Sequence, residues 1–451
     1  MDEAFRLTAT DAAARIRAGT LSPVDLVDAC LARIDALEPR VMAWVSVDAD
    51  GARRAARERL DAVRAGRPLG ALHGVPVGLK DIYHARGFVT TSGAGSFFHE
   101  RPDADATTVA RLRDAGAIIL GKATTTEFAS RDPTPTRNPW NLAHTPGGSS
   151  SGSAAAVSAG MVPLALGSQT VGSTLRPAAY CGIVGLKATH GRVSASGMVP
   201  LAWSLDTVGI FGRDVADVAL GLAVLAGYDA GDPASVDVPV PDYLHALSDR
   251  GRAPRLGLPR RWIERAEPET AAHVLAVADR CKGAGAIVED VDLPSSAAGL
   301  SEAGQRVMHA EAAAFHAARF PAHADRYQEK FRATLAAGID VAARDYVPAL
   351  RHCRQFRRDL EPLLARFDAI LSPVAPGPAP RGIDSTGDAS FCAPWSYAGV
   401  PAIALPSGIA ANGLPLGVQL SAGPWQEPTL LATAQWIERV LAFRGEPSFA
   451  A

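Results

Sequence analysis

The chain of 451 residues carries 45 basic and 47 acidic side chains, which leaves a net charge of −2 at pH 7. This balance, without a dense cationic run, argues against binding of nucleic acid or of a membrane surface through bulk charge. Hydrophobic residues make up 47% of the chain, yet no apolar stretch reaches the roughly 18 residues of a membrane span. The acidic first residues do not resemble a signal peptide, so the sequence predicts a cytoplasmic globular protein.

Cysteine and histidine follow no metal-binding or disulfide pattern. The five cysteines are scattered without a CxxC pair, and the eleven histidines show no HxxxH or HExxH spacing. Zinc sites and disulfide frameworks depend on such spacings. We therefore expect neither a metal nor an organic cofactor.

The first part of the chain predicts three helices. Thr8 and Asp11 form the capping-box pattern that starts the first helix. Pro23, at a first helical position, starts the second helix, and Pro39 is expected to close it. Residues 49–66 form the third, whose many arginines indicate a solvated face.

Further along the chain, short apolar runs alternate with helical stretches, which indicates an α/β layer with buried strands. The runs GVPVGLK, AIILGK and VPLALG are typical of such strands. Residues 265–366 are rich in arginine and have a pattern that predicts helices. Strand-like runs follow in FDAILSPVAP, GVPAIALPSG and LPLGVQL. A last helix is predicted at about 427–442.

The domain organisation follows from this alternation. We predict a single domain over residues 1–451, with a core at about 68–215. A variable helical cap at about 230–365 is expected to pack against that core. The Pro- and Gly-rich segments 228–240 and 373–388 are predicted to be loops.

The stretch HTPGGSSSGSAAAVSAG, residues 144–160, joins glycines and serines to small helix-forming residues. A flexible linker stays polar or glycine-rich over some length, whereas this stretch turns at once into a helix. A Walker loop needs a lysine after its last glycine, and here Gly152 is followed by Ser153 and Ala154. The remaining interpretation is a catalytic turn, which needs partners elsewhere in the chain.

Two further motifs supply such partners. Lys80 ends the strand-like run in GVPVGLKD, and Ser173 lies in GSQTVGSTLRPAAYCGIVGLKAT, downstream of Ser149 in the glycine–serine stretch. These motifs, in this order and together with GKATTTEFA and the C-terminal runs, resemble the amidase signature family of serine hydrolases. The resemblance spans nearly the whole chain and implies an α/β amidase-signature fold, a large mixed β-sheet covered on both faces by α-helices.

The resemblance also implies the roles of the site residues. Ser173 is the nucleophile that becomes acylated, Ser149 passes on its proton, and Lys80 is the base; the peptide bond before Ser149 is cis in the family. The oxyanion hole is formed by the backbone amides of four consecutive residues: Thr170, Val171, Gly172 and Ser173. The substrate pocket is expected to include two residues of neighbouring segments: Ala129 and Ser150.

The chemistry itself calls for these residue types. A serine hydroxyl is a poor nucleophile at neutral pH and needs a base. A lysine serves as base only when neutral, which burial favours by lowering its pKa from about 10.4. Lys80 meets this need if Asp81 points to the opposite face of the strand. Nearby histidines are then not needed as bases: His73, His144 and His190. Cys181 is expected to be a small buried apolar residue.

Four residues depart from the family pattern. Ser151 and Val171 stand where the family commonly has glycine, and Gln169 replaces a common aspartate. Arg176 follows Ser173 by three positions rather than two. Because a β-branched residue does not readily adopt a positive φ, the oxyanion segment must keep ordinary dihedrals at Val171 or be remodelled.

The sequence therefore predicts hydrolysis of an amide, a carbamate (urethane) or an aryl ester through an acyl-enzyme, with a medium-sized aryl or alkyl substrate. The helical segment looks more like stand-alone amidases than like the glutamine-hydrolysing A subunit of a tRNA-dependent amidotransferase, which stays open as an alternative. A catalytically inactive binding module is the alternative of another class. The expected partner is a small-molecule substrate, without nucleic acid or membrane, and a homodimer stays open.

Overall fold

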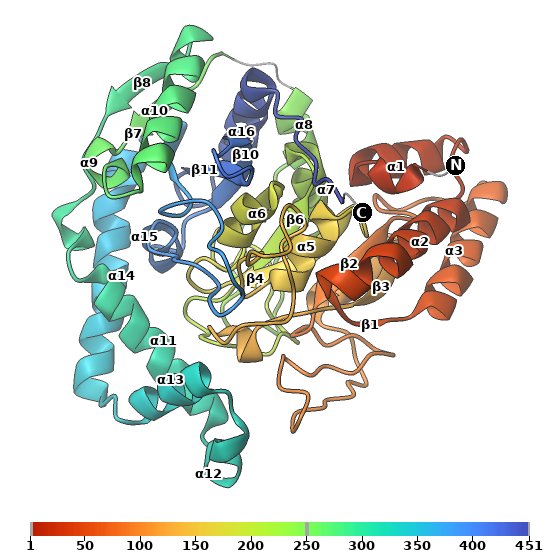
Figure 1. Cartoon of the computed structure of the whole chain (residues 1–451), viewed down its shortest axis with the longest axis horizontal. Helices are drawn as coiled ribbons and strands as arrows, with labels where there is room; N and C mark the ends of the chain where they lie inside the picture. Colours follow the sequence, from red (N-terminus) through yellow and green to blue (C-terminus); the bar gives the residue numbers. More distant parts are fainter. Residues whose placement is uncertain (1–2, 249–251, 450–451) are drawn as a thin grey trace.

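The computed structural model describes residues 3–248 and 252–449 (Figure 1). A mixed sheet of 11 strands forms its centre, which confirms the predicted α/β architecture. From edge to edge the strands are β1 (Trp44–Val47), β3 (Ile118–Ala123), β2 (Pro76–Lys80), β4 (Leu164–Gln169), β6 (Thr207–Gly212), β5 (Val184–Lys187), β10 (Ala402–Ile409), β11 (Pro415–Ser421), β9 (Ala369–Pro373), β7 (Arg255–Leu258) and β8 (Ile287–Asp290).

The strand directions place the ends of β2 and β4 together. β2 pairs in parallel with β3 on one side and with β4 on the other, while β4 pairs antiparallel with β6. Every residue of β2, β3 and β4 is buried, as expected for parallel strands covered on both faces. Lys80 and Gln169, the last residues of β2 and β4, therefore lie at the same edge of the sheet.

Helices cover both faces of the sheet (Figure 1). Along β6, Gly209 faces Thr174 at the start of α6, and Ile210 faces Gly221 of α7, so alternate residues meet helices on opposite faces. The α-helices are α1 (Ala9–Arg17), α2 (Pro23–Val41), α3 (Ala49–Arg64), α4 (Thr107–Asp114), α5 (Ser151–Ser158), α6 (Leu175–Cys181), α7 (Val215–Leu225), α8 (Tyr243–Ser248), α9 (Arg260–Ile263), α10 (Pro268–Gly283), α11 (Leu300–His316), α12 (Phe320–His323), α13 (Glu329–Ile339), α14 (Ala343–Leu364), α15 (Ala393–Tyr397) and α16 (Glu427–Leu441). Short 3₁₀ helices are η1 (Ala4–Arg6), η2 (Glu127–Ala129), η3 (Ser295–Ala297) and η4 (Ala324–Arg326).

Most predicted elements are confirmed, and the end of the second helix is corrected. α2 does not close at Pro39 but continues to Val41. Met42 then takes a left-handed conformation, and the Glu38 carboxylate accepts the next two amides, those of Ala43 and Trp44. A proline in the last helical turn loses one hydrogen bond, and the Glu38 contacts offset that loss.

The segment at 230–365 contains both strands and helices. β7 and β8 extend the sheet, and the long helices α11, α13 and α14 stand at one side of it (Figure 1). The carboxylate of Asp132 accepts the amides of Lys330 and Phe331 at 2.9 and 2.7 Å, and Glu127 accepts that of Gln328 at 2.8 Å. The core thus caps the start of α13 and fixes these helices beside η2.

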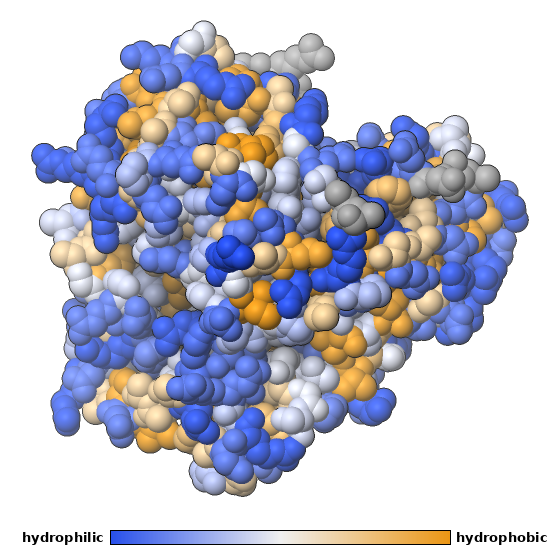
Figure 2. All heavy atoms as spheres, viewed as in Figure 1, coloured by the Kyte–Doolittle hydropathy of each residue, from blue (hydrophilic) through white to orange (hydrophobic). Residues whose placement is uncertain are grey.

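Hydrophilic residues cover most of the face in Figure 2, with apolar residues in patches between them. The apolar side chains concentrate in one large buried cluster around the sheet. Within residues 3–248 and 252–449, no helix combines the length and hydropathy that a bilayer crossing needs.

Gly152 sets how closely α5 approaches β3, and we expect Gly152→Ala to destabilise the protein. A Cβ at this position would lie 2.2 Å from the carbonyl oxygen of Ala43 and 2.4 Å from the amide nitrogen of Thr124. Both atoms belong to the backbone and cannot move aside cheaply. The free energy of unfolding, measured in urea, should fall by about 1–3 kcal/mol.

Gly283 in α10 provides the matched control, because nothing lies within 4 Å of a Cβ added there. Gly283→Ala should leave stability unchanged or raise it by up to about 1 kcal/mol. Equal effects of the two substitutions would contradict the close contact of α5 with β3.

Candidate active site

The glycine–serine stretch forms a tight turn before α5. The Gly148–Ser149 peptide bond is cis, which confirms the expectation from the family, and Gly147 has a φ of 81°. The Ser151 hydroxyl donates a hydrogen bond of 2.7 Å to the carbonyl of Gly147, so this departure from the family pattern closes the turn. Ser149 is fully buried, two residues before α5 begins.

Lys80 points from the end of β2 onto this turn. Its Nζ donates to the hydroxyl of Ser149 at 2.7 Å and to that of Ser168 at 2.8 Å. The side chain is fully buried, and burial lowers the Lys80 pKa to about 7, against a smaller upward effect of the Asp206 carboxylate. A substantial fraction of Lys80 is therefore neutral at neutral pH, as a base must be.

Asp81 does not contact this lysine. Its carboxylate lies 2.8 Å from Nζ of Lys122, and both side chains are buried. The same carboxylate accepts hydrogen bonds from the amide and hydroxyl of Thr91. The charge of Asp81 is thus balanced by Lys122 on the other face of the strand, as the alternation of side chains along a strand predicted.

The loop after β4 carries Ser173, and Gln169 holds it. The side-chain oxygen of Gln169, Oε1, accepts the backbone amides of Thr174 and Leu175 at 2.8 and 2.9 Å, which satisfies two donors at the start of α6. Its Nε2 donates to the Ser396 hydroxyl at 2.9 Å, and that hydroxyl donates to the carbonyl of Val171 at 2.6 Å. A carboxylate at position 169 could not donate this second bond.

The amides expected to form the oxyanion hole are available. Within the described part of the chain, none of the amides of residues 170–173 donates to a protein acceptor. Val171 does not have a positive φ, so the segment keeps ordinary dihedrals there. The Thr170 hydroxyl donates to the Asp206 carboxylate at 2.5 Å, and burial raises the Asp206 pKa to about 6. These contacts hold the segment in place through a side chain, and its backbone amides stay free.

The two predicted pocket residues lie in different environments. Ala129 is buried at the end of η2 with a φ of 59°. The Ser150 hydroxyl donates a hydrogen bond to the Ser168 carbonyl and accepts one from the Ser168 backbone amide, each at 3.2 Å. Their contact with substrate stays a prediction.

The remaining candidates from the sequence do not contact Lys80, Ser149 or Ser173 among the described residues, and His190 lines the larger cavity described below. His73 and His190 contact the backbone carbonyls of Arg59 and Trp203, and His144 pairs through its backbone with Arg381. Cys181 is fully buried, and burial raises its thiol pKa, so it is not a reactive thiolate. No group of three or more His, Cys, Asp or Glu residues suited to a metal ion occurs within the described ranges.

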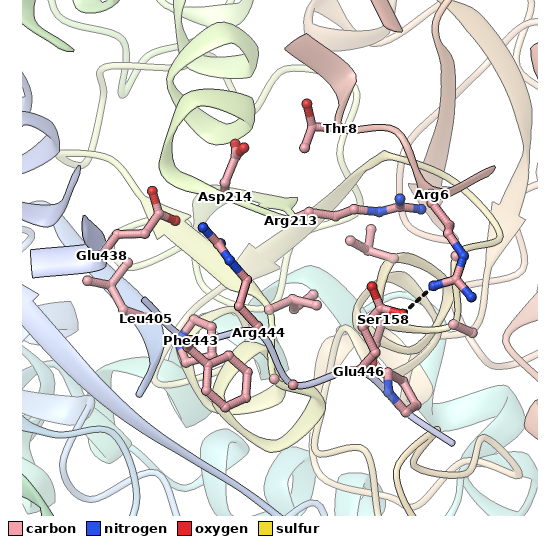
Figure 3. Close-up of a pocket in the computed structure, with 18 of the residues that line it drawn as sticks. Arg6, Thr8, Ser158, Arg213, Asp214, Leu405, Glu438, Phe443, Arg444 and Glu446 are labelled. Atoms are coloured by element: carbon pink, nitrogen blue, oxygen red, sulfur yellow. Dashed lines mark hydrogen bonds and ion pairs between the residues drawn. The ribbon is translucent and has the colours of Figure 1, made fainter. Parts of the chain in front are cut away.

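The structure contains two cavities of ligand size. One, of about 780 Å³, lies between the 190–206 loop and α14, and Asp206 forms part of its wall. The other, of about 610 Å³, is lined by charged residues that include Arg6, Arg213 and Glu438 (Figure 3). This second cavity lies at the far end of α5, beside Ser158. In the described part of the chain, neither cavity has Lys80, Ser149 or Ser173 in its wall, and the first is linked to the site only through Asp206, which accepts the hydrogen bond of Thr170.

Sequence reasoning missed Ser168 and Asp206, and it noted Arg176 only as a departure from the family pattern. In the structure Ser168 contacts Lys80, Asp206 contacts Thr170, and Arg176 contacts the carbonyl of Gly148. Each is a polar residue beside an apolar run, and that pattern alone is too common to identify a site. Their contacts join positions far apart in the chain, which only the fold brings together.

We expect the rate to follow the protonation of Lys80. Because burial depresses the Lys80 pKa to about 7, kcat/KM should rise about tenfold per pH unit below that value and level off above it. Initial rates between pH 5 and 9 with an uncharged substrate would check this. A profile that is flat over this range would contradict lysine as the base.

At the end of a strand of the mixed sheet, buried Lys80 contacts the Ser149 hydroxyl, a pairing of lysine with serine that is typical of serine–lysine hydrolases. The amidase family model matches residues 25–431. The chain is 38% identical over 478 residues to the A subunit of the glutamyl-tRNA(Gln) amidotransferase from Anaeromyxobacter sp. (strain K), with 97% of each chain covered. It therefore belongs to the amidase signature family and is a hydrolase of C–N bonds.

Solved structures agree with this assignment. The peptide amidase from Stenotrophomonas maltophilia superposes with a TM-score of 0.87 at 33% identity and covers 98% of this chain and 99% of its own. The 6-aminohexanoate cyclic dimer hydrolase superposes with a TM-score of 0.85 at 26% identity, over 97% and 98% of the two chains. The fold is thus shared by enzymes that act on different amides.

Proposed function

We propose that the protein is a stand-alone amidase that hydrolyses an amide or carbamate of a small molecule through an acyl-enzyme on Ser173. The hydrogen bond from Lys80 Nζ to Ser149 Oγ carries this proposal, because it joins a base of pKa about 7 to the expected relay hydroxyl. The free amides of residues 170–173 support it, since donors without a protein partner are available to a developing oxyanion.

In the acylation step, neutral Lys80 accepts the Ser149 proton while Ser149 accepts that of Ser173. The Ser173 oxygen bonds to the carbonyl carbon, and the carbonyl oxygen becomes an oxyanion held by the amides of residues 170–173. The C–N bond then breaks, and the leaving nitrogen receives the proton back from Lys80 through Ser149. The products are the acyl-enzyme and the free amine.

Deacylation reverses these roles with water as the nucleophile. Water gives a proton to the Ser149–Lys80 pair and attacks the ester carbon. The ester bond to Ser173 breaks, and the serine oxygen recovers its proton from the same pair. The acid product leaves, and the lysine is neutral again.

The larger cavity supports a medium-sized substrate with an apolar group. Its volume of about 780 Å³ lies in the range of small-molecule sites. Trp203, half-exposed at this cavity, and Leu350 of α14 offer apolar contacts, and Arg354 offers a charge. We place the leaving group here, beside Asp206. A rise in KM for aryl amides in Trp203→Ala, with kcat kept, would test this placement.

A second candidate is the glutamine-hydrolysing role in a tRNA-dependent amidotransferase. The identity of 38% over 97% of a protein with that role favours it. That function needs a partner that uses the released ammonia, whereas a stand-alone amidase works by itself. Glutamine turnover that appears only with a partner protein would decide for this candidate.

Labelling with a fluorophosphonate, followed by peptide mapping, tests the proposed chemistry. We expect label on Ser173 in the wild type and none after Lys80→Ala. Label at another residue would contradict the assignment of Ser173 as nucleophile, whereas the absence of any label in the wild type would favour an inactive binding module. A panel of anilides, carbamates, aryl esters and glutamine then ranks the substrates.

We also propose that catalysis requires neither nucleic acid nor membrane, and that one chain carries the whole site. Lys80, Ser149 and Ser173 all come from the same chain, which supports this proposal. The test is a dilution series that takes the protein from any dimer to the monomer. Activity per chain that stays constant over this series would agree with the proposal.

A further inference from the structure

Arg176 lies one helical turn after Ser173, on α6, and is buried with 6% of its surface exposed. Burial lowers its pKa, yet a guanidinium remains charged in proteins. The mechanism proposed above, on which this inference rests, does not use this cation. Its position is one of the departures from the family pattern.

Three acceptors surround the guanidinium. Nη2 donates to the Gly148 carbonyl at 2.5 Å and to the Thr386 hydroxyl at 3.2 Å, and Nη1 donates to the Gly387 carbonyl at 2.8 Å. The Gly148 carbonyl belongs to the peptide that leads into Ser149. Arg176 therefore joins the turn of the relay serine to a segment more than 200 residues away in the chain.

No carboxylate lies within ion-pair distance of Arg176 among the residues that the structure describes. Its Nε is buried without a hydrogen-bond partner. A buried cation that forms no ion pair is destabilising unless its surroundings compensate, and Asp388 acts on Arg176 only from beyond ion-pair distance. An apolar side chain of similar length would fill this space without that cost, so packing alone does not account for an arginine here.

The segment that Arg176 holds touches both catalytic loops. We call residues 384–389 the strap. A Cβ at Gly148 would lie 2.7 Å from the Thr386 methyl group, and one at Gly172 would lie 2.7 Å from Cβ of Ala389. The strap thus packs against the turn before Ser149 and against the oxyanion segment before Ser173.

We propose that Arg176 is a positioning residue that holds the Gly148 carbonyl and the strap, so that the Ser149 hydroxyl stays between Lys80 and Ser173. The rigid fork of the guanidinium reaches acceptors in two directions at once. An ammonium at this position would reach fewer of them. Displacement of a reacting group by about 1 Å can cost about 100-fold in rate, although the residue responsible does not touch the substrate.

The test compares Arg176→Lys and Arg176→Met with Arg111→Lys. Arg111 on α4 also donates to three backbone carbonyls, those of Leu225, Gly227 and Tyr228, away from the catalytic residues. We expect kcat to fall about 100-fold in Arg176→Met and less in Arg176→Lys, with KM within threefold of the wild type. Arg111→Lys should keep kcat within threefold. The rate of fluorophosphonate labelling of Ser173 should fall in parallel with kcat.

Stability is measured alongside, since a buried arginine also supports the fold. All rates are taken at least 20 °C below the Tm of each variant, so that unfolding does not contribute. If kcat stays within threefold in both Arg176 variants, or if only KM rises, the positioning role is wrong, and the second result would make Arg176 a substrate-binding group. A wild type that neither labels at Ser173 nor hydrolyses the panel would instead overturn the proposed function.

Discussion

Replacing Ser173 by alanine is expected to lower kcat by roughly 10⁴- to 10⁶-fold, because the acyl-enzyme can no longer form and only binding and the oxyanion donors remain. Substrate affinity should change little, since the alanine keeps the loop and its free amides. The measurement is kcat with the best substrate of the panel, together with mass spectrometry of the protein after rapid quenching. The wild type should show the mass of the acyl group, and the variant should not.

Ser153 provides a matched control for this substitution. Its hydroxyl is also buried, and it donates to the Leu166 carbonyl at 2.8 Å on the adjoining strand. Ser153→Ala removes a serine hydroxyl from the same region and should keep kcat within about threefold. A Ser173→Ala enzyme that retains a tenth of the wild-type rate would contradict the nucleophile assignment.

The strands that carry the site could be predicted because their apolar character is local. GVPVGLK and VPLALG are short apolar runs next to glycine or proline, and the structure has β2 and β4 there. Lys80 could be identified because it ends the apolar run of the GVPVGLKD motif, which resembles that of the family; a lysine after an apolar run is not enough by itself, since AIILGK also ends in a lysine, Lys122. The order of the 11 strands could not be predicted in this way, because strand pairing depends on contacts between distant segments.

The departures from the family pattern could be seen in the sequence but not explained by it. Ser151 closes the turn through the carbonyl of Gly147, four residues before it. Gln169 caps α6 locally, yet its second bond goes to Ser396, 227 positions away. Such a contact leaves no local signal, since many other polar residues lie beside apolar runs without any such partner.

The same limit applies to the charges around the base. The proximity of Asp81 to Lys80 in the sequence suggested a possible conflict, and alternation along the strand predicted its resolution. The actual partner, Lys122, lies on the neighbouring strand β3, at the position paired with Leu79. The structure thus provides two buried lysines on adjacent strands, and only the one without a carboxylate contact is suited to act as a base.

Lys80→Met is expected to lower kcat/KM by up to about 10⁴-fold, because methionine fills a similar volume but cannot accept the Ser149 proton. The residual rate should lose its rise through pH 7, since the group with a pKa of about 7 is gone. Lys80→Arg should be similarly inactive, because a guanidinium stays protonated. This variant separates a base from a positive charge, which arginine would retain.

Lys187 is the matched control for this lysine. It is also fully buried at the end of a strand, burial lowers its pKa to about 7, and its Nζ donates to the Ala188 carbonyl at 3.0 Å. It contacts no serine hydroxyl among the described residues. Lys187→Met should therefore lower Tm but keep kcat/KM within about threefold and preserve the pH profile. If Lys187→Met abolished the rise with pH and Lys80→Met did not, the base would be Lys187 and the relay through Ser149 would be wrong.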